Sequence, residues 1–277
     1  MPTPEWPVRL FNRSVLKQRK FREITAYLGQ TQGLSCLDIG ADNGVISYLL
    51  RQRGGEWQSA DLDAQAVAAI RSLVVHNVFQ IDGSHTPFRD DTFDRVVIVD
   101  FLEHIDTDRD FISDMYRIIK PAGELIINVP HSKQSLLRRF RLAIGQTDEK
   151  HGHVRPGYTT EEIGALLGPR FTIIAVHTYS KFFSECVDTL ITAAVDWMKR
   201  GHAASAKGRV VTGKDMGQYH KMFKIYSLIY PIVWMFAQFD KALLWCSGYM
   251  LVVKARTCKE SDMGKTGELL ERERMQA

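Results

Sequence analysis

Residues 35–44 read Ser-Cys-Leu-Asp-Ile-Gly-Ala-Asp-Asn-Gly, and this stretch decides the fold. Its first half is a short apolar run typical of a buried strand, and the strand leads directly into a turn that contains Gly40 and Gly44. Glycine permits a sharp turn and a close approach to a bound nucleotide because it has no Cβ. The two glycines stand four apart, with Asp38 two residues before the first, so this is not the GxGxxG loop that cradles a pyrophosphate.

Strand and helix patterns alternate outward from this turn. Further strands are predicted at 56–60, 78–81, 95–99, 124–129, 171–176 and 249–255. Helices are predicted between the earlier strands at 45–53, 64–73 and 108–119. Strands joined by helices of this length form right-handed crossover units, so we expect a mainly parallel sheet covered on both faces.

Several segments lie outside this alternation. A basic helix is predicted from about 9 to 28, a second from 132 to 144, a short capped helix at 160–167, and a helical stretch at 184–245 interrupted by polar residues 201–217. The predicted division is an N-terminal helical segment (1–30), a catalytic domain (31–183 and 247–257), a helical insertion (184–246) and a flexible tail (258–277).

The composition is that of an ordinary globular protein, with 45% apolar residues, 25% charged residues and a net charge of +4 over 277 residues. This mild charge does not suggest a nucleic-acid partner. Four scattered cysteines without metal-binding spacing indicate reduced thiols and no structural metal. The N-terminal residues lack the apolar core of a signal peptide, so a cytoplasmic location is expected. The longest uncharged run, 225–239, is 15 residues, short of the ~20 needed to span a membrane.

Acidic residues follow three of the predicted strands. Asp61 closes the second strand 17 residues after Gly44, close to the ~20-residue spacing of a carboxylate that binds ribose hydroxyls. Asp82 and Gly83 follow the third strand, and Asp100 follows the fourth. In this kind of fold, ligands bind at the carboxyl edge of the sheet.

The order of these motifs resembles the class I S-adenosylmethionine-dependent methyltransferases, in particular the small-molecule group related to the ubiquinone and menaquinone methylases. The family's first motif is matched by Asp38, Ile39, Gly40 and Gly44, although Asp42 stands where the family most often has its middle glycine. Residues 100–105, Asp-Phe-Leu-Glu-His-Ile, resemble the family's Glu-Val-Leu-Glu-His signature. The resemblance covers about residues 35–130.

This resemblance implies an α/β fold, Rossmann-like and doubly wound, with a seven-stranded, mainly parallel sheet whose last strand is antiparallel. It also implies an enzyme with S-adenosylmethionine as cofactor. The expected cofactor-binding residues are Asp38, Gly40, Ala41, Gly44, Asp61, Leu62, Asp82, Gly83, Val99 and Asp100. An acidic strand end suits this cofactor because it carries an ammonium group and a sulfonium.

A histidine-containing loop, residues 150–159, follows the fifth strand and should open at the ligand-binding edge. His151 and His153, together with His104, are candidate catalytic residues, because a base that titrates near neutrality assists a hydroxyl acceptor. Alternatively the loop only covers the cofactor, and His104 is only packed by its neighbours. A metal held by His151 and His153 with Asp148 or Glu149 is disfavoured, because the spacing matches no metal motif.

Residues 222–239 are too apolar and aromatic for a water-exposed helix. They predict either a helix buried on the catalytic domain or in a dimer interface, or a lid for a lipophilic acceptor that touches a membrane surface. In the second case Pro231 should kink the segment into two arms, and the basic helix at 133–141 should face acidic headgroups.

The reaction expected is methyl transfer to a small, lipophilic or lipid-linked acceptor at oxygen. C- or N-methylation of a quinone or another biosynthetic intermediate, an aminopropyl transferase on the same fold, and a scaffold without catalysis remain the alternatives. Nucleic-acid and protein acceptors are disfavoured, because no Asn-Pro-Pro-aromatic tetrad is found. The sequence leaves the oligomeric state open.

Overall fold

The computed structural model describes residues 6–41, 43–133, 136–143, 152–199 and 216–259. Its centre is a seven-stranded sheet in the order β3-β2-β1-β4-β5-β7-β6. The strands are β1 (Ser35–Ile39), β2 (Glu56–Asp61), β3 (Val78–Gln80), β4 (Phe93–Val99), β5 (Ile119–Pro130), β6 (Phe171–Tyr179) and β7 (Met250–Thr257).

The strand directions confirm the expected topology. Neighbouring strands from β3 to β5 are parallel, and β7 runs antiparallel to both β5 and β6. β1 and β4 lie side by side in the middle, with Ile39 opposite Ile98. The chain leaves β1 toward one edge of the sheet and leaves β4 toward the other. Ligands bind at such a switch point in doubly wound folds.

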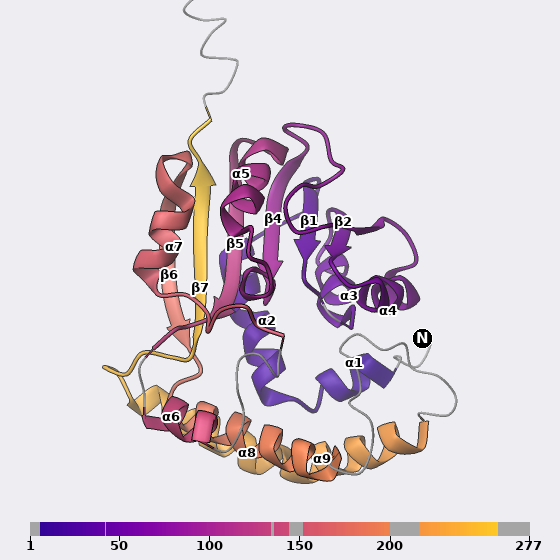
Figure 1. The fold of residues 1–277 in the computed structure, drawn as a ribbon. Helices are drawn as coiled ribbons and strands as arrows, with labels where there is room; N and C mark the ends of the chain where they lie inside the picture. The colour runs from indigo at the N-terminus through magenta and orange to yellow at the C-terminus, as the bar shows by residue number, and fades with distance from the viewer. Residues whose placement is uncertain (1–5, 42, 134–135, 144–151, 200–215, 260–277) are drawn as a thin grey trace, which may run out of the picture.

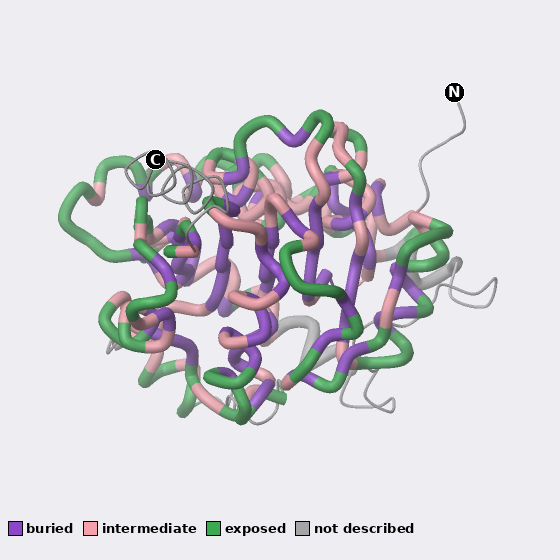
Figure 2. The backbone as a smooth tube through the Cα atoms, turned by 90° about the horizontal axis from the view of Figure 1, so that it is seen from above, coloured by how far each residue is buried: buried purple, intermediate pink, exposed green. Residues whose placement is uncertain are grey.

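Helices cover both faces of the sheet (Figure 1). They are α1 (Trp6–Phe11), α2 (Val15–Leu28), α3 (Val45–Arg51), α4 (Ala64–Val74), α5 (Asp108–Ile118), α6 (Leu136–Ala143), α7 (Thr160–Leu167), α8 (Phe182–Lys199) and α9 (Met216–Phe239). One face packs on α5 and α7, and the other packs on α2 and α3. Strand residues alternate between these two cores, and Figure 2 shows the buried positions running through the middle of the molecule.

The N-terminal segment differs from its prediction. One helix was expected from about 9 to 28, but the chain forms α1 and α2 with a turn between them. Ser14 adopts an extended backbone and its hydroxyl accepts a hydrogen bond from the Lys17 amide at 3.4 Å. A serine N-cap satisfies an amide that would otherwise lack a helical partner, and this favours a new helix start at residue 15.

Other boundaries shift by a few residues. The basic helix expected at 132–144 is the shorter α6, whereas α7 begins and ends as expected and carries a complete capping box at Thr159 and Glu162. β5 begins at Ile119, earlier than expected, because Ile119 already pairs with Phe93 of β4. The predicted turn 120–123 forms an irregularity in β5 before the pairing resumes between Glu124 and Arg95. The predicted polar interruption (201–217) lies almost wholly outside the described residues, as does the tail beyond Lys259.

The insertion between β6 and β7 is helical, as predicted. α6, α8 and α9 form a layer across the end of the sheet at which the parallel strands finish (Figure 1). The helix α9 continues through Pro231, the residue at which the sequence predicted a kink. On both sides of Pro231 the helix packs on one partner surface, Val15 of α2 with Val187 and Ile191 of α8, and this shared packing holds it as one element.

One helix in the described part of the chain, Met222–Ala242, is long and apolar enough to cross a membrane by length and composition. Only 11% of its most apolar 18-residue stretch is buried. The apolar side chains are therefore not explained by burial in the protein core.

Candidate active site

The turn after β1 passes directly over the end of β4. Gly40 has φ 83°, and a Cβ there would lie 2.2 Å from the Val99 carbonyl oxygen. Gly44 has φ 77°, and a Cβ there would lie 2.7 Å from the Ile70 Cα. Both positions require glycine, because the backbone is left-handed there and a Cβ would collide with neighbouring backbone atoms. Ala41 is buried in the turn, and Asp42 lies outside the described residues.

Asp38 lies beneath this turn and is completely buried. Its carboxylate accepts hydrogen bonds from Ser47 and from Ser59 (2.8 Å), and it pairs with Arg51 at 3.5 Å. Burial raises the pKa of Asp38, while its hydrogen bonds and the Arg51 charge act in the opposite direction. These contacts join β1, β2 and α3, so the carboxylate fixes the strand ends that form the turn.

Asp100 occupies the switch point itself. It follows β4 with φ 46°, a left-handed conformation that is uncommon for a residue with a side chain. Its Oδ1 accepts from the Asn128 amide at 3.0 Å, and its Oδ2 pairs with the Lys20 ammonium. The Tyr179 hydroxyl donates to the side-chain oxygen Oδ1 of Asn128, and this bond fixes the orientation of the Asn128 side-chain amide. The carboxylate is therefore held at both oxygens.

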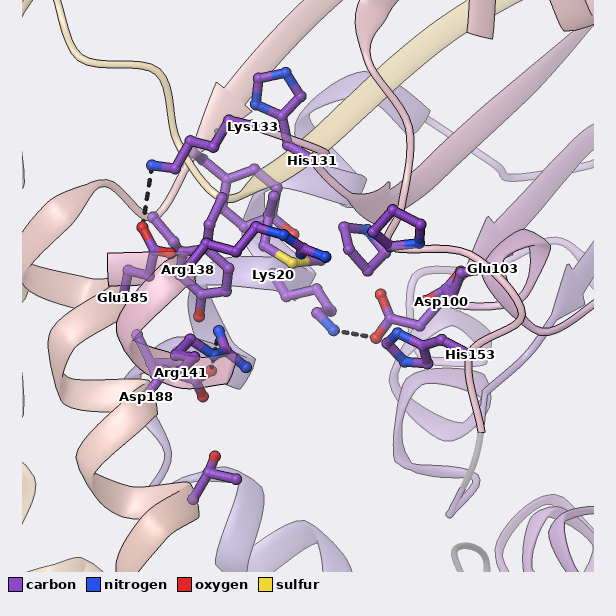
Figure 3. A pocket seen from close by; sticks show the side chains of 18 of the residues that line it. Lys20, Asp100, Glu103, His131, Lys133, Arg138, Arg141, His153, Glu185 and Asp188 are labelled. Carbon is purple, nitrogen blue, oxygen red and sulfur yellow. Dashed lines mark hydrogen bonds and ion pairs between the residues drawn. The ribbon is translucent and has the colours of Figure 1, made fainter. Parts of the chain in front are cut away.

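Two cavities meet at Lys20 and Asp100. The first, about 260 Å³, contains Gly40, Ala41 and Val99 of the predicted cofactor site and is closed by α1 and Tyr226 of α9. The second, about 340 Å³, lies between the sheet edge and the α6–α8 side of the helical layer. Figure 3 shows Arg138 and Arg141 on one side of the second cavity, Glu103 and His153 on the other, and Lys20 reaching Asp100 between them.

Charges of both signs line the second cavity. Lys133 pairs with Glu185 at 3.1 Å, and Arg141 pairs with Asp188 at 3.8 Å. Burial lowers the affinity of Lys20 for its proton, but the charge and hydrogen bond of Asp100 outweigh this effect and raise the pKa of Lys20. Lys20 is therefore charged at neutral pH where the two cavities meet.

The other predicted cofactor residues continue along the same edge of the sheet. Asp61 ends β2 and is 8% exposed, so this strand end is buried. Leu62 and Gly83 come together there, because a Cβ on Gly83 would lie 3.0 Å from the Leu62 side chain. The exposed Asp82 accepts hydrogen bonds from the His85 and Ser84 amides and the Ser84 hydroxyl, and these lower its pKa to about 2. None of these four residues lines either cavity.

Two of the three predicted catalytic histidines lie together. The rings of His104 and His153 are 4.8 Å apart, edge to face, and both side chains line the second cavity. The His104 Nδ1 lies 2.8 Å from the Gly152 carbonyl oxygen, so this contact fixes the ring. Glu103 completes a group whose ligand atoms all lie within 4.8 Å of one another and could hold a divalent cation. His151, with Asp148 and Glu149, lies outside the described residues.

The loop that carries His153 is fastened to the end of β4 and the start of α5. The Val154 amide donates to the Glu103 carbonyl at 2.9 Å, and Arg155 pairs with Asp108 and donates to the Ile105 carbonyl. The buried Tyr158 hydroxyl hydrogen-bonds to Asp108 at 2.9 Å, and burial together with that carboxylate raises its pKa. Arg155 and Tyr158 thus hold the loop, while His153 faces the cavity.

The sequence analysis did not identify four residues of this site, Lys20, Glu103, Asn128 and Tyr179. Lys20 and Asp100 are 80 residues apart in the sequence, and Tyr179 and Asn128 are 51 apart, so no local spacing connects them. Glu103 had a signal, because it lies beside His104 in the quoted signature and is 1% exposed. A carboxylate buried in this way is a candidate for a functional group, because burial of a charge without a partner is costly.

Comparison with known proteins identifies the domain. A family model described as a methyltransferase domain matches residues 37–127. A demethylmenaquinone methyltransferase of Tropheryma whipplei is 26% identical over 42% of this chain and 50% of its own length. A ubiquinone/menaquinone biosynthesis C-methyltransferase of Haemophilus ducreyi is 34% identical over 36% of this chain and 42% of its own length. The chain therefore spans about half the length of these relatives, or less.

Solved structures extend the likeness in fold. A SAM-dependent methyltransferase from Archaeoglobus fulgidus superposes with a TM-score of 0.54 at 18% identity, covering 88% of this chain and 94% of that one. A geranyl diphosphate C-methyltransferase from Streptomyces coelicolor, crystallised with S-adenosyl-L-homocysteine, has a TM-score of 0.54 at 15% identity, covering 87% and 78%.

The matched segment contains both the glycine turn after β1 and Asp100 after β4. Residues 37–127 make up a methyltransferase domain of the S-adenosylmethionine-dependent class I type, similar to the ubiquinone and menaquinone methylases.

Proposed function

We propose that this protein transfers a methyl group from S-adenosylmethionine to an oxygen atom of a small, lipophilic or lipid-linked acceptor. The observation that supports this proposal best is that two cavities meet at Asp100. One contains the glycine turn, and the other contains the histidines and the inner side of the helical layer. A methyl group carried in the first cavity could reach an acceptor in the second without leaving the protein.

The residues at this junction suit a positioning mechanism. When bound, S-adenosylmethionine supplies an electrophilic methyl carbon on a sulfonium, so alignment and exclusion of water provide most of the acceleration. Asn128 and Lys20 hold the Asp100 carboxylate in one orientation beside the first cavity. In the second cavity His153 could take the acceptor's hydroxyl proton as the oxygen attacks, because imidazole titrates near neutrality.

The remaining cofactor residues are assigned on the same basis. Asp61 would bind the ribose hydroxyls, Asp82 and Gly83 would lie near the adenine, and Gly40, Ala41, Leu62 and Val99 would supply backbone and apolar contacts. Asp38 and Gly44 would act by holding the turn. The position of all these residues along the carboxyl edge of one sheet supports the assignment.

The lipophilic character of the acceptor is inferred from the helical layer. Leu142 lines the second cavity, and Phe140 beside it is 52% exposed. The proposal therefore includes a peripheral contact of the segment 222–245 with a membrane, reached from the cytoplasm. Carbon methylation is the second candidate, favoured by the relative named as a C-methyltransferase, whereas a fission-yeast relative at 26% identity is named as an O-methyltransferase.

Labelled cofactor tests the reaction. The purified chain would be incubated with methyl-labelled S-adenosylmethionine and a lipid extract, and the products analysed by mass spectrometry. A labelled lipophilic product whose fragments place the methyl group on oxygen supports the proposal, and a label on carbon supports the second candidate. Absence of cofactor binding in calorimetry would contradict both and leave a scaffold without catalysis.

A further inference from the structure

Exposed apolar side chains gather on one face of the molecule. Twelve of the sixteen large hydrophobic residues that are exposed in the described part of the chain lie on α6, α8, α9 or the segment just after α9. They are Phe140, Leu142, Phe182, Leu190, Ile225, Leu228, Ile232, Trp234, Met235, Phe239, Leu244 and Trp245. Patches of this kind mark a surface that another apolar phase covers.

α9 has two different apolar faces. Val233 and Ala237 point inward and pack with Val15 of α2. The outward face is a separate stripe at positions 225, 228, 232, 235 and 239, spaced three and four apart, and Leu228 there is 77% exposed. The inward face lies on α1, α2 and α8 along the helix, so α9 cannot be surrounded by lipid as a spanning helix would be. This geometry favours a helix that lies in the plane of an interface.

The charges exposed on this face are all basic among the described residues. Arg139 of α6, Lys224 near the start of the outward stripe and Lys241 just after α9 are exposed. The acidic residues of the same layer, Glu185 and Asp240, are buried, and Asp188 is only partly exposed. An apolar face bordered by exposed cations is complementary to an anionic bilayer surface.

We propose that the face formed by α6, α8, α9 and residues 240–245 docks on an anionic phospholipid bilayer. A second copy of this chain fits the face less well, because a twofold interface would join two copies of one face on which the exposed charges of the described residues are all basic, with no exposed acidic partner for them. Trp245, which is 97% exposed, and Trp234, which is 52% exposed, are placed where aromatic residues sit at the headgroup level.

Docking in this orientation gives the acceptor a path to the second cavity. Arg138 and Arg141 of α6 line that cavity, while Arg139 and Phe140 between them face outward. Leu142 does both, since it lines the cavity and is 41% exposed. A lipophilic acceptor could therefore keep its tail in the bilayer while its head reaches the histidines. This step rests on the proposed methyl transfer, whereas the docking of the face, which makes the proposed membrane contact specific, does not depend on that activity.

Vesicle flotation of the full chain tests the docking. The vesicles would be phosphatidylcholine alone or an equal mixture of phosphatidylcholine and phosphatidylglycerol. One variant, Leu228→Ser with Ile232→Ser, removes two large side chains from the outward stripe, and Val75→Ser is its control at an exposed apolar residue between α4 and β3. A second variant, Arg139→Glu, reverses an outward charge, and Arg170→Glu is its control at the opposite end of β6.

The wild type should float with the mixed vesicles and much less with phosphatidylcholine alone. The stripe variant should lower the partition coefficient at least about tenfold, because binding scales with the apolar area buried. Arg139→Glu should lower it about tenfold on the mixed vesicles and little on the neutral ones. Both controls should float like the wild type, and cofactor binding in solution should show that every variant is folded.

Several results would overturn the docking proposal. These are no flotation of the wild type, equal flotation of the wild type and the stripe variant, or binding that does not depend on phosphatidylglycerol. A stable dimer in sedimentation whose formation the stripe variant abolishes, without vesicle binding, would assign the face to a second copy. Flotation that behaves as expected from a protein without methyl-transfer activity would contradict the proposed function and leave the docking intact.

Discussion

Replacement of Lys20 by methionine should destabilise the fold by about 1–3 kcal/mol. Methionine keeps a similar length of apolar stem but removes the ammonium that pairs with Asp100. Exposed ion pairs contribute ~0–1 kcal/mol, and removal of one partner of a buried pair costs ~3–5 kcal/mol. The Lys20 and Asp100 side chains are 23% and 34% exposed, between these limits, and Asp100 keeps its hydrogen bond from Asn128.

The effect should depend on pH in a defined direction. The pKa of Lys20 is raised above its usual value of 10.5, because Asp100 outweighs the effect of burial. The folded chain therefore holds this proton more tightly than the unfolded chain. The stabilisation is complete below pH 10.5 and is lost as the pH rises through the higher value of the folded state. The difference in the free energy of unfolding between wild type and Lys20→Met should be constant from neutral pH up to pH 10.5. It should shrink at higher pH, as Lys20 loses its proton in the folded state.

Urea unfolding of a double-mutant cycle with Asp100→Asn measures the pair directly. Asp90→Asn is a matched control, because Asp90 pairs with Arg117 at 2.8 Å but is 73% exposed, so its loss should cost less than about 1 kcal/mol. Turnover should fall more than cofactor affinity in Lys20→Met, since the pair lies at the junction of the two cavities. A coupling below about 0.5 kcal/mol with unchanged turnover would refute this account of the junction.

Three further substitutions test individual assignments. Asp61→Ala should weaken cofactor binding by ~2–3 kcal/mol in calorimetry. Asp61→Asn keeps the shape of this buried strand end and is the control for folding. Equal cofactor affinity of the wild type and both variants would remove Asp61 from the site. His153→Ala should lower turnover ~10²–10⁴-fold with cofactor affinity retained if the imidazole is the base, whereas a parallel fall in both would assign the loop a covering role. Tyr158→Phe should cost ~1–3 kcal/mol in urea unfolding, because its buried hydroxyl bonds to Asp108 and the Leu102 carbonyl; no loss would show that Arg155 holds the loop alone.

The sequence predicted those features that depend on local pattern. Gly40 and Gly44, the β-branched strands and the alternation of elements were sufficient for the sheet, and the family resemblance implied the antiparallel last strand. The break between α1 and α2 also had a local signal, because Ser14 is a good N-cap. The continuity of α9 through Pro231 had no local signal, since it accompanies the packing of Val233 and Ala237 with side chains of α2 and α8.

The contacts that define the site depend on tertiary structure and could not be predicted in this way. Lys20 reaches Asp100 only because α2 packs across the sheet face that ends at the switch point. Likewise, His104 and His153 meet because a loop that begins after β5 returns to the end of β4. The sequence predicted Asp100, His104 and His153 near one sheet edge and did not identify Lys20. No local pattern indicated which of these side chains would pair.

The helical layer and the switch point share an anchor, which would keep the proposed docking face in register with the site. β6 ends at Tyr179, whose hydroxyl bonds to Asn128 and through it to Asp100. α8 begins three residues later, and the buried Asp240 after α9 accepts hydrogen bonds from the Lys181 and Phe183 amides at 2.7 and 2.9 Å. These bonds tie the end of α9 to the start of α8, directly after the chain leaves β6. Because a buried carboxylate with several amide partners is costly to separate from them, the layer should move with this strand end. A surface that binds the layer is therefore held at a fixed position relative to the carboxylate at the reacting site.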